Sequence, residues 1–146
     1  MSAQSNGTVV AWGDNTHGQC NVPGSLTNVT AIAAGQFGSL ALKADGTVVF
    51  WGNEMSGLSY LPQGLSGVTA ISAGTHFGMA LKSDGSVVAW GANAKGEATV
   101  PVTLNGTGVI ALAAGLQNSI ALKSDGTIVS WGDNASSKNS PPASAQ

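Results

Sequence analysis

The stretch Ser39-Leu-Ala-Leu-Lys-Ala-Asp-Gly-Thr-Val-Val-Phe-Trp-Gly52 decides the fold, because the chain repeats it. Close copies stand at 78–91 (GMALKSDGSVVAWG) and 119–132 (SIALKSDGTIVSWG), and the second half stands once more at 6–13 (NGTVVAWG). Successive tryptophans of these copies are 39, 39 and 41 residues apart. A fixed period of this length indicates a repeat architecture, in which like units stack and bury their apolar faces against one another.

Each repeat unit predicts short β-strands and no helix. Residues 29–35 are small and apolar, residues 39–43 alternate, and residues 47–51 are β-branched and aromatic, a composition that favours extended structure. The Asp-Gly pair at 45–46 predicts a two-residue type I′ hairpin between the second and third strands. A brief fourth strand is expected around residues 22–23, at a sheet edge where the proline needs no N–H.

Four short antiparallel strands in each repeat predict an all-β fold, a β-propeller of four-stranded blades with about three blades per chain. The alanine-rich first strand is expected at the crowded axis, and the proline-bearing strand at the outer rim. The repeats run over about 6–45, 46–84 and 85–132 and are permuted relative to the blades. We expect the N-terminus at 1–5 and the Ser/Pro-rich tail at 133–146 to be flexible.

Three blades are too few to close a ring, because propellers have about four to eight blades and an open blade exposes unpaired strand edges. The third-strand sequence occurs four times, whereas the first and second strands occur three times, so one copy is surplus. This surplus strand at 8–12 can pair with the blade of another subunit. We therefore predict a homo-oligomer, most simply a two-fold dimer with six blades and, as second choice, a trimer. The alternative is a fragment of a larger gene product.

Composition argues against several classes of partner. Of the 146 residues 8% are charged, and the net charge of −2 includes five lysines and no arginine. No surface can then carry the dense positive charge that nucleic acid or an anionic membrane requires. Cys20 is the one cysteine, which allows neither an internal disulfide nor a zinc site. Residues 1–6 have neither the basic nor the apolar region of a secretory signal, which leaves the compartment open.

Strand direction places two sets of loops on one face of the propeller, those after Ala-Gly and those after Trp-Gly. These loops differ between units that otherwise agree, and divergent loops on a rigid scaffold are where binding residues concentrate. The Asp-Gly turns and the loops after proline are expected on the opposite face. The partner-binding candidates are Gln36, Phe37, His76, Phe77, Gln117 and Asn118 in the first set, and Asn15, His17, Glu54, Met55 and Lys95 in the second.

Some of these side chains have a second interpretation. Phe37 and Phe77 start the second strand of their units, so packing in the propeller core is their alternative role. His17 and His76 lack a third ligand with suitable spacing, and we predict no metal site. No nucleophile is paired with a base and no phosphate-binding motif occurs, so we predict neither an enzyme nor a cofactor. The lysines before the Asp-Gly pairs predict a charged rim of solvated turns: Lys43, Lys82 and Lys123.

The repeat units closely resemble the regulator-of-chromosome-condensation repeat. The resemblance rests on Ala33-Ala-Gly35, residues 39–43, Asp45-Gly46 and Val49-Phe-Trp-Gly52, and it covers residues 6 to about 132. The short repeat with Val-Pro looks most like a bacterial branch that includes a secreted propeller inhibitor of β-lactamases. That resemblance implies a secreted or cell-surface location and a contact surface on the loop face. In the inhibitor this surface is richer in tyrosine and tryptophan, the residues that anchor protein interfaces.

Together these observations predict a non-catalytic protein-binding or scaffold module that presents variable loops on one propeller face to an unidentified protein. Two other functions stay open at this point. One is a structural or adhesive repeat segment of a larger secreted protein. The other is a carbohydrate-binding propeller, supported only by the repeated asparagine and tryptophan positions.

Overall fold

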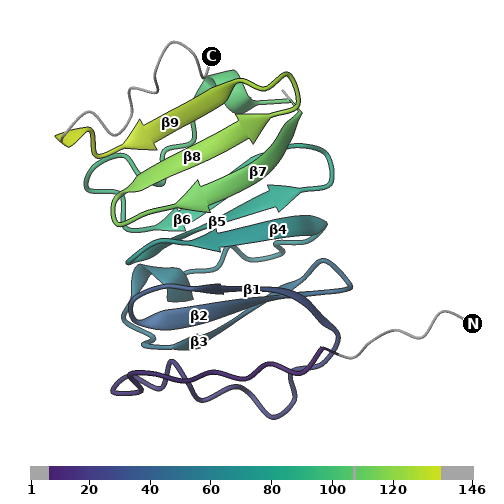
Figure 1. The fold of residues 1–146 in the computed structure, drawn as a ribbon, viewed down its shortest axis with the longest axis vertical. Helices are drawn as coiled ribbons and strands as arrows, with labels where there is room; N and C mark the ends of the chain where they lie inside the picture. The colour runs from purple at the N-terminus through teal and green to yellow at the C-terminus, as the bar shows by residue number, and fades with distance from the viewer. Residues whose placement is uncertain (1–6, 107, 136–146) are drawn as a thin grey trace, which may run out of the picture.

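The computed structural model describes residues 7–106 and 108–135, and the ends expected to be flexible, 1–5 and most of 133–146, lie outside these ranges. The described residues form three antiparallel sheets, each with its three strands in sequence order (Figure 1). Two single turns of 3₁₀ helix, η1 (Gly57–Ser59) and η2 (Val102–Leu104), lie between sheets. The strands are β1 (Val29–Ala34), β2 (Gly38–Lys43), β3 (Val48–Gly52), β4 (Val68–Ala73), β5 (Phe77–Lys82), β6 (Val87–Gly91), β7 (Val109–Ala114), β8 (Asn118–Lys123) and β9 (Ile128–Gly132).

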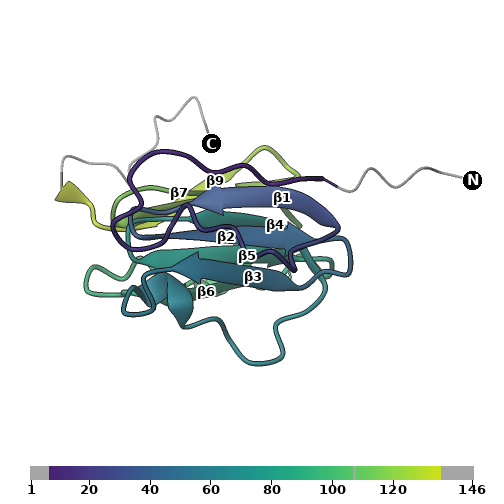
Figure 2. The ribbon, with the colours of Figure 1, turned by 90° about the horizontal axis from the view of Figure 1, so that it is seen from below.

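The three sheets stack face to face along the long axis of the molecule (Figure 1). From below, β1 and β4 lie on one side of the stack and β3 and β6 on the other (Figure 2). The first strands contact each other from sheet to sheet, and the amide N–H of Ala114 in β7 donates to Ser72 Oγ in β4 at 2.9 Å. The alanine-rich first strand is therefore the one at which neighbouring sheets come closest, as its small side chains predict.

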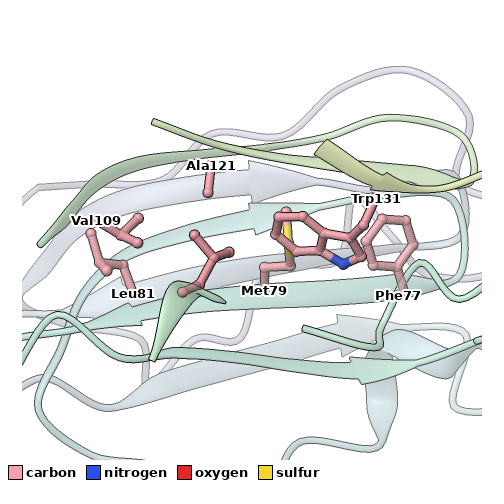
Figure 3. Packing of buried hydrophobic residues seen from close by; sticks show 7 residues of the cluster. Phe77, Met79, Leu81, Val109, Ala121 and Trp131 are labelled. Carbon is pink, nitrogen blue, oxygen red and sulfur yellow. The ribbon is translucent and has the colours of Figure 1, made fainter. Parts of the chain in front are cut away.

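Each sheet has a leading face, which packs on the next sheet along the chain, and a trailing face, which packs on the preceding one. Leu40 and Leu42 of the first leading face are buried against Trp90 on the second trailing face. The next interface repeats this arrangement, with Met79 and Leu81 packed against the trailing face of the third sheet (Figure 3). Burial of these apolar faces between sheets supplies the main stabilisation of a stack in which each sheet contacts only its neighbours.

The expected fourth strand is not formed, so each sheet in the described residues has three strands instead of four. Around Pro62 the chain makes a turn instead, in which Leu65 N donates to Pro62 O at 3.2 Å. Pro101 likewise precedes a turn of 3₁₀ helix, with Leu104 N donating to Pro101 O at 2.9 Å. Proline cannot donate to a ladder, and a segment this short gains more from local turn bonds than from partial pairing.

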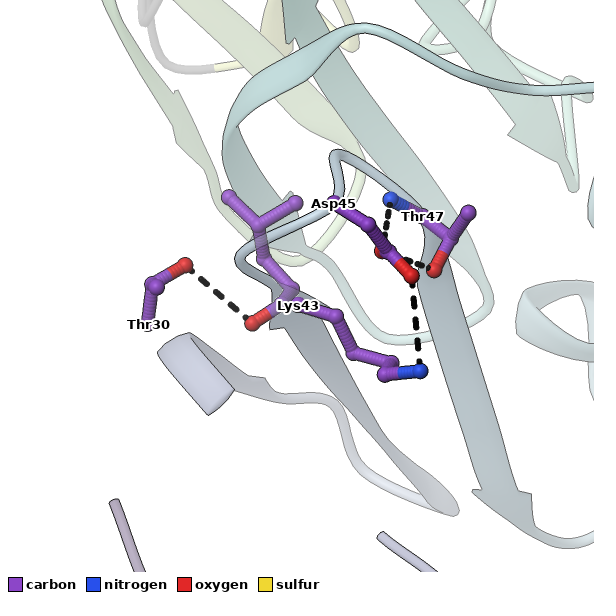
Figure 4. Close-up of polar contacts among 5 residues, drawn as sticks. Thr30, Lys43, Asp45 and Thr47 are labelled. Atoms are coloured by element: carbon purple, nitrogen blue, oxygen red, sulfur yellow. Dashed lines mark hydrogen bonds and ion pairs between the residues drawn. The ribbon is translucent and has the colours of Figure 1, made fainter. Parts of the chain in front are cut away.

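The two-residue type I′ hairpin predicted for the Asp-Gly pairs is wrong. Lys43 N bonds Thr47 O and Gly46 N bonds Lys43 O, both at 2.9 Å, which makes a loop of three residues, 44–46. Gly46 has a φ of +79°, whereas Asp45 is not in the left-handed region. This is a type I turn followed by a left-handed glycine. The Asp45 carboxylate accepts hydrogen bonds from the N–H and hydroxyl of Thr47 and pairs with Lys43 (Figure 4).

The three sheets are three blades, and they do not close a ring (Figure 1). Within 7–106 and 108–135, no helix is long and apolar enough to cross a membrane.

Candidate functional site

The two sets of variable loops lie on one face of the stack, as strand direction predicts. Asn53 N donates to Phe37 O at 2.8 Å, which joins the loop after Trp-Gly to the loop after Ala-Gly. The same bond joins Ala92 to His76 at 2.9 Å and Asp133 to Gln117 at 2.8 Å. We call the surface formed by residues 14–17, 36–37, 53–55, 75–76, 92–95 and 116–117 the loop face.

Phe37, His76 and Gln117 occupy the same structural position in successive sheets, because the main-chain carbonyl of each accepts the equivalent hydrogen bond. The rings of Phe37 and His76 are 5.2 Å apart between centroids and tilted by 46°. His17, from the loop before the first sheet, packs edge-on against Phe37, with the ring centroids 5.2 Å apart. Three of the predicted residues, from three separate loops, thus form one ring cluster, His17–Phe37–His76.

The side chains around the ring cluster are open to solvent or half-buried. Gln117 and Asn118 are half-buried, and the other candidates outside the ring cluster are exposed. Met55 is the most open of them, with 88% of its surface accessible, and Leu116 adds a second exposed apolar side chain at 66%. The exposed candidates are Gln36, Asn15, Glu54, Met55 and Lys95.

Asn15 has a structural task on this face as well. Its side-chain amide donates to Asn21 Oδ1 and its carbonyl oxygen accepts from Cys20 N, both at 2.8 Å. Asn93 holds the equivalent loop of the second sheet in the same way, through Thr99 and the N–H of Ala98. Asn15 therefore shapes the loop that carries His17.

Phe77 is not part of the loop face, which corrects its place among the candidates. It is 1% exposed and lies in the core cluster with Met79 and Trp131 (Figure 3). Phe77 stands three residues after Gly74, whereas Phe37 stands two residues after Gly35. In extended backbone a shift of one residue moves a side chain to the opposite face of the sheet.

The opposite face carries the Asp-Gly turns, where lysine and aspartate of each turn pair with each other. The Nζ to carboxylate distances are 3.5 Å for Lys43–Asp45, 4.0 Å for Lys82–Asp84 and 3.3 Å for Lys123–Asp125. The predicted solvated rim is therefore present, with its charges paired within each turn. Hydrogen bonds from the hydroxyl and N–H of Thr127 are the main cause that lowers the pKa of Asp125 to about 2.

A similar carboxylate stands on the loop face beside the ring cluster. The hydroxyl and N–H of Thr16 donate to Asp14, and these bonds, with a smaller contribution from His17, lower the pKa of its carboxyl. Gln19 Nε2 donates to the same carboxylate at 3.2 Å. Across the described part of the chain, no three His, Cys, Asp or Glu side chains are grouped so that they could hold a metal ion.

The sequence of this stack matches a known repeat. The family model described as regulator of chromosome condensation (RCC1) repeat matches residues 68–97 and 109–137. Residues 68–97 and 109–137 thus carry RCC1 repeats. No curated protein matches it.

Solved structures share the arrangement of sheets. The ectodomain of the receptor kinase CR4 from Physcomitrella patens is 28% identical, with a TM-score of 0.64 over 79% of this chain and 32% of that chain. Prp20p from Saccharomyces cerevisiae, a protein described with its binding to Gsp1p and histones, is 26% identical, with a TM-score of 0.60 over 71% and 30%. The yeast protein bound to Kap60 gives the same identity and TM-score over 71% and 29%.

The chain spans about a third of the length of these structures. The prediction of an all-β fold of the RCC1 propeller type is confirmed, with three blades that do not close a ring.

One hydrogen bond repeated in every sheet could not be predicted from residue types. Each tryptophan of a third strand donates its indole N–H to a main-chain carbonyl in the loop before its sheet: Trp51 to Gln19 at 2.9 Å, Trp90 to Leu58 at 3.0 Å and Trp131 to Glu97 at 2.9 Å. The acceptors always stand seven residues after the preceding tryptophan. Their side chains differ because the backbone accepts the bond, so only spacing could have revealed them.

Proposed function

We propose that the chain is a non-catalytic protein-binding module whose loop face contacts the partner, with the ring cluster His17–Phe37–His76 at the centre of the contact. The single observation behind this proposal is that the cluster draws side chains from three loops into one surface, at ring distances of 5.2 Å. Binding energy at protein interfaces is concentrated in a few such packed aromatic groups. The relatives described with Gsp1p, histones and Kap60 support protein partners for this repeat.

The chemistry of the loop face indicates what kind of surface it accepts. Phe37 is half-buried and contacts two imidazoles, and Met55 and Leu116 are exposed in loops of the same face. An apolar side chain of the partner can pack on these groups, while carbonyl or carboxylate oxygens accept hydrogen bonds from the imidazole N–H groups. The chain has no arginine and only five lysines, so a strongly acidic partner gains little here.

The test compares two variants for capture of proteins from a native lysate by quantitative mass spectrometry. The double variant Phe37→Ala/His76→Ala removes two rings of the cluster, and Lys82→Ala/Asp84→Ala changes the opposite face. We expect the first to lose, and the second to keep, whatever the unmodified chain enriches, with both variants still folded at room temperature. Equal capture by both variants contradicts a partner site on the loop face. Enrichment of no protein by the unmodified chain leaves a structural repeat as the function.

We further propose that copies of the chain complete the ring, as a dimer of six blades and, second, as a trimer. This proposal is supported by apolar side chains at the two ends of the stack, such as Ile32 and Ile120, which are more exposed than their equivalents between sheets inside the chain. Light scattering tests it, with twice the 14.4 kDa chain mass expected for the dimer. A mass of one chain at all concentrations contradicts it.

A further inference from the structure

Residues 8–12 have the sequence of a third strand, but within 7–106 and 108–135 no second strand pairs with them. Thr8-Val-Val-Ala-Trp12 corresponds to Thr47-Val-Val-Phe-Trp51 of the first sheet. Among the described residues, Gly7, just before this segment, forms an isolated antiparallel bridge with Val29. The segment runs beneath the first sheet, at the purple end of the chain (Figure 1). It has the sequence of a strand but forms no ladder with another described strand.

The side of this segment that should pack on a preceding sheet is bare. Trp12 is 84% exposed, whereas the tryptophans of the three sheets are 5 to 7% exposed. Val10 is 69% exposed, while its equivalent Val88 packs against a core cluster. Exposed apolar side chains gathered in this way mark interaction surfaces.

A groove lies between the segment and the trailing face of the first sheet. Its volume is about 560 Å³, and its lining includes Val9, Trp12, Ile32 and Trp51. Ile32 is 62% exposed, whereas its equivalents Ile71 and Leu112 pack against the two core clusters. In the internal interfaces this space is filled by the first and second strands of the preceding sheet. The groove therefore exposes the apolar positions that the first and second strands of a preceding sheet cover inside the chain.

The other end of the stack offers such strands. Ile120 and Leu122 on the leading face of the third sheet are half-buried, because no further described sheet covers them (Figure 1). Their equivalents in the first two sheets are at most 6% exposed: Leu40, Leu42, Met79 and Leu81. Inside the chain, a leading face packs on a trailing face twice. At the two ends of the stack, one leading face and the groove at the other end are left without such a partner among the described residues.

One polar group indicates which strand gives way when the two ends meet. The segment 8–12 has the same repeat position as β9. The edge of β8 that pairs with β9 can pair with only one of these two strands at a time. β9 places Ser130 where the segment has Ala11, and Ser130 Oγ is buried without a hydrogen-bond partner. A buried hydroxyl without a partner is destabilising, and alanine at that place removes it.

We propose that residues 8–12 of one copy add to β8 of a second copy in place of β9, while β7 and β8 of that copy fill the groove. This inference rests on the ring closure proposed above and specifies which strands pair where two copies meet. The register follows from β8–β9, in which Ile120 faces Ser130 and Ala121 faces Val129. In the exchanged ladder Ile120 faces Ala11 of the other copy. The exposed indole of Trp12 then lies where Trp131 donates to Glu97.

Disulfide trapping tests this register. In a Cys20→Ser background, one copy carries Ala11→Cys and a second, separately labelled copy carries Ile120→Cys. Residues directly opposite in an antiparallel ladder have Cα atoms about 4.5 to 5.5 Å apart, which a disulfide spans. The segment 8–12 and β8 lie at opposite ends of one chain's stack (Figure 1), so the bond can form only between copies. The matched control replaces Ile120→Cys with Ala44→Cys, an exposed position in the turn after β2.

We expect a cross-linked mixed dimer from the Ala11/Ile120 pair and none from the Ala11/Ala44 pair. Trp12→Ala should weaken dimerisation about tenfold or more, and Val102→Ala, equally exposed in η2, should leave it unchanged. A dimer mass without the cross-link, or equal cross-linking of both pairs, overturns the strand exchange but not ring closure. A single-chain mass at all concentrations overturns both and leaves the groove to a repeat beyond these residues.

Discussion

The indole Nε1 of Trp131 donates a hydrogen bond to the main-chain carbonyl oxygen of Glu97 at 2.9 Å. Ser119 Oγ donates to the same oxygen at 2.8 Å, so a strand tryptophan and a second-strand serine hold the loop between two sheets. Gln19 O receives the equivalent pair, from Trp51 at 2.9 Å and Ser39 at 3.1 Å. The tryptophan therefore does two things at once: it fills the interface between sheets and it fixes the backbone of the loop that leads to the loop face.

Replacing this tryptophan should cost stability through both effects. Trp131→Phe removes the indole donor and part of the buried ring, for an expected loss of about 1 to 3 kcal/mol in the free energy of unfolding. Urea denaturation followed by circular dichroism measures it. Tyr60→Phe is the control, because Tyr60 is an exposed aromatic residue outside the strands. Equal stability of Trp131→Phe and the unmodified chain would show that the bond to Glu97 is not formed in solution.

A glycine in η1 sets how closely the loops of the loop face approach. A Cβ built on Gly57 overlaps the carbonyl oxygen of His76 and lies 2.7 Å from Ala92 N. Gly57→Ala should therefore lower the unfolding free energy by about 1 to 3 kcal/mol and displace His76 from Phe37. Thermal denaturation and the His76 ring resonances in NMR measure the two effects. Gly24→Ala, where nothing lies within 4 Å of the new Cβ, should change neither.

The strands, their order and the sharing of one face by two loop sets followed from the sequence, because each depends on a local pattern repeated in register. The turn type did not, since Asp-Gly suits both a two-residue loop and a type I turn closed by a left-handed Gly46. The prediction of a fourth strand was wrong, because backbone groups around the prolines form hydrogen bonds within local turns. Phe37 and Phe77 share a residue type and a place near the start of a second strand, but their distances from the preceding Ala-Gly differ by one residue. The loop carbonyls bonded by tryptophan left no trace in residue type.

The Asp-Gly turns should weaken only in acid. Hydrogen bonds from Thr127 lower the pKa of Asp125 from 3.8 to about 2 in the folded chain, and the pKa values of Asp45 and Asp84 are lowered for the same reason. A lowered folded pKa means that the carboxylate stabilises the fold above its ordinary pKa and that this contribution disappears as the pH falls through the folded value. Stability from these turns should thus be constant from about pH 5 upward and fall between about pH 4 and 2.

The measurement is the melting temperature as a function of pH, for the unmodified chain and for Asp125→Ala. The variant has already lost the Thr127 bonds, so it should melt lower at neutral pH and show a shallower decline in acid. Parallel curves for the two proteins would mean that Asp125 is not the titrating group.

Phe37 and Phe77 give the sharpest separation between a binding residue and a core residue, because they differ by one position in the repeat. Phe77 is 1% exposed beside Met79 and Trp131, so Phe77→Ala should cost about 3 to 5 kcal/mol of unfolding free energy. Phe37 is half-buried and touches two imidazoles, so Phe37→Ala should cost clearly less while removing the centre of the ring cluster.

Denaturant titration and partner capture, run on both variants, distinguish the two roles. Phe37→Ala should remain folded at room temperature and lose the captured protein, and Phe77→Leu, which preserves apolar volume, should keep both fold and capture. If Phe37→Ala unfolds as readily as Phe77→Ala, the ring at position 37 serves the packing of the first sheet, and recognition must come from the exposed side chains around it. If it stays folded and still binds, the partner contacts some other part of the stack.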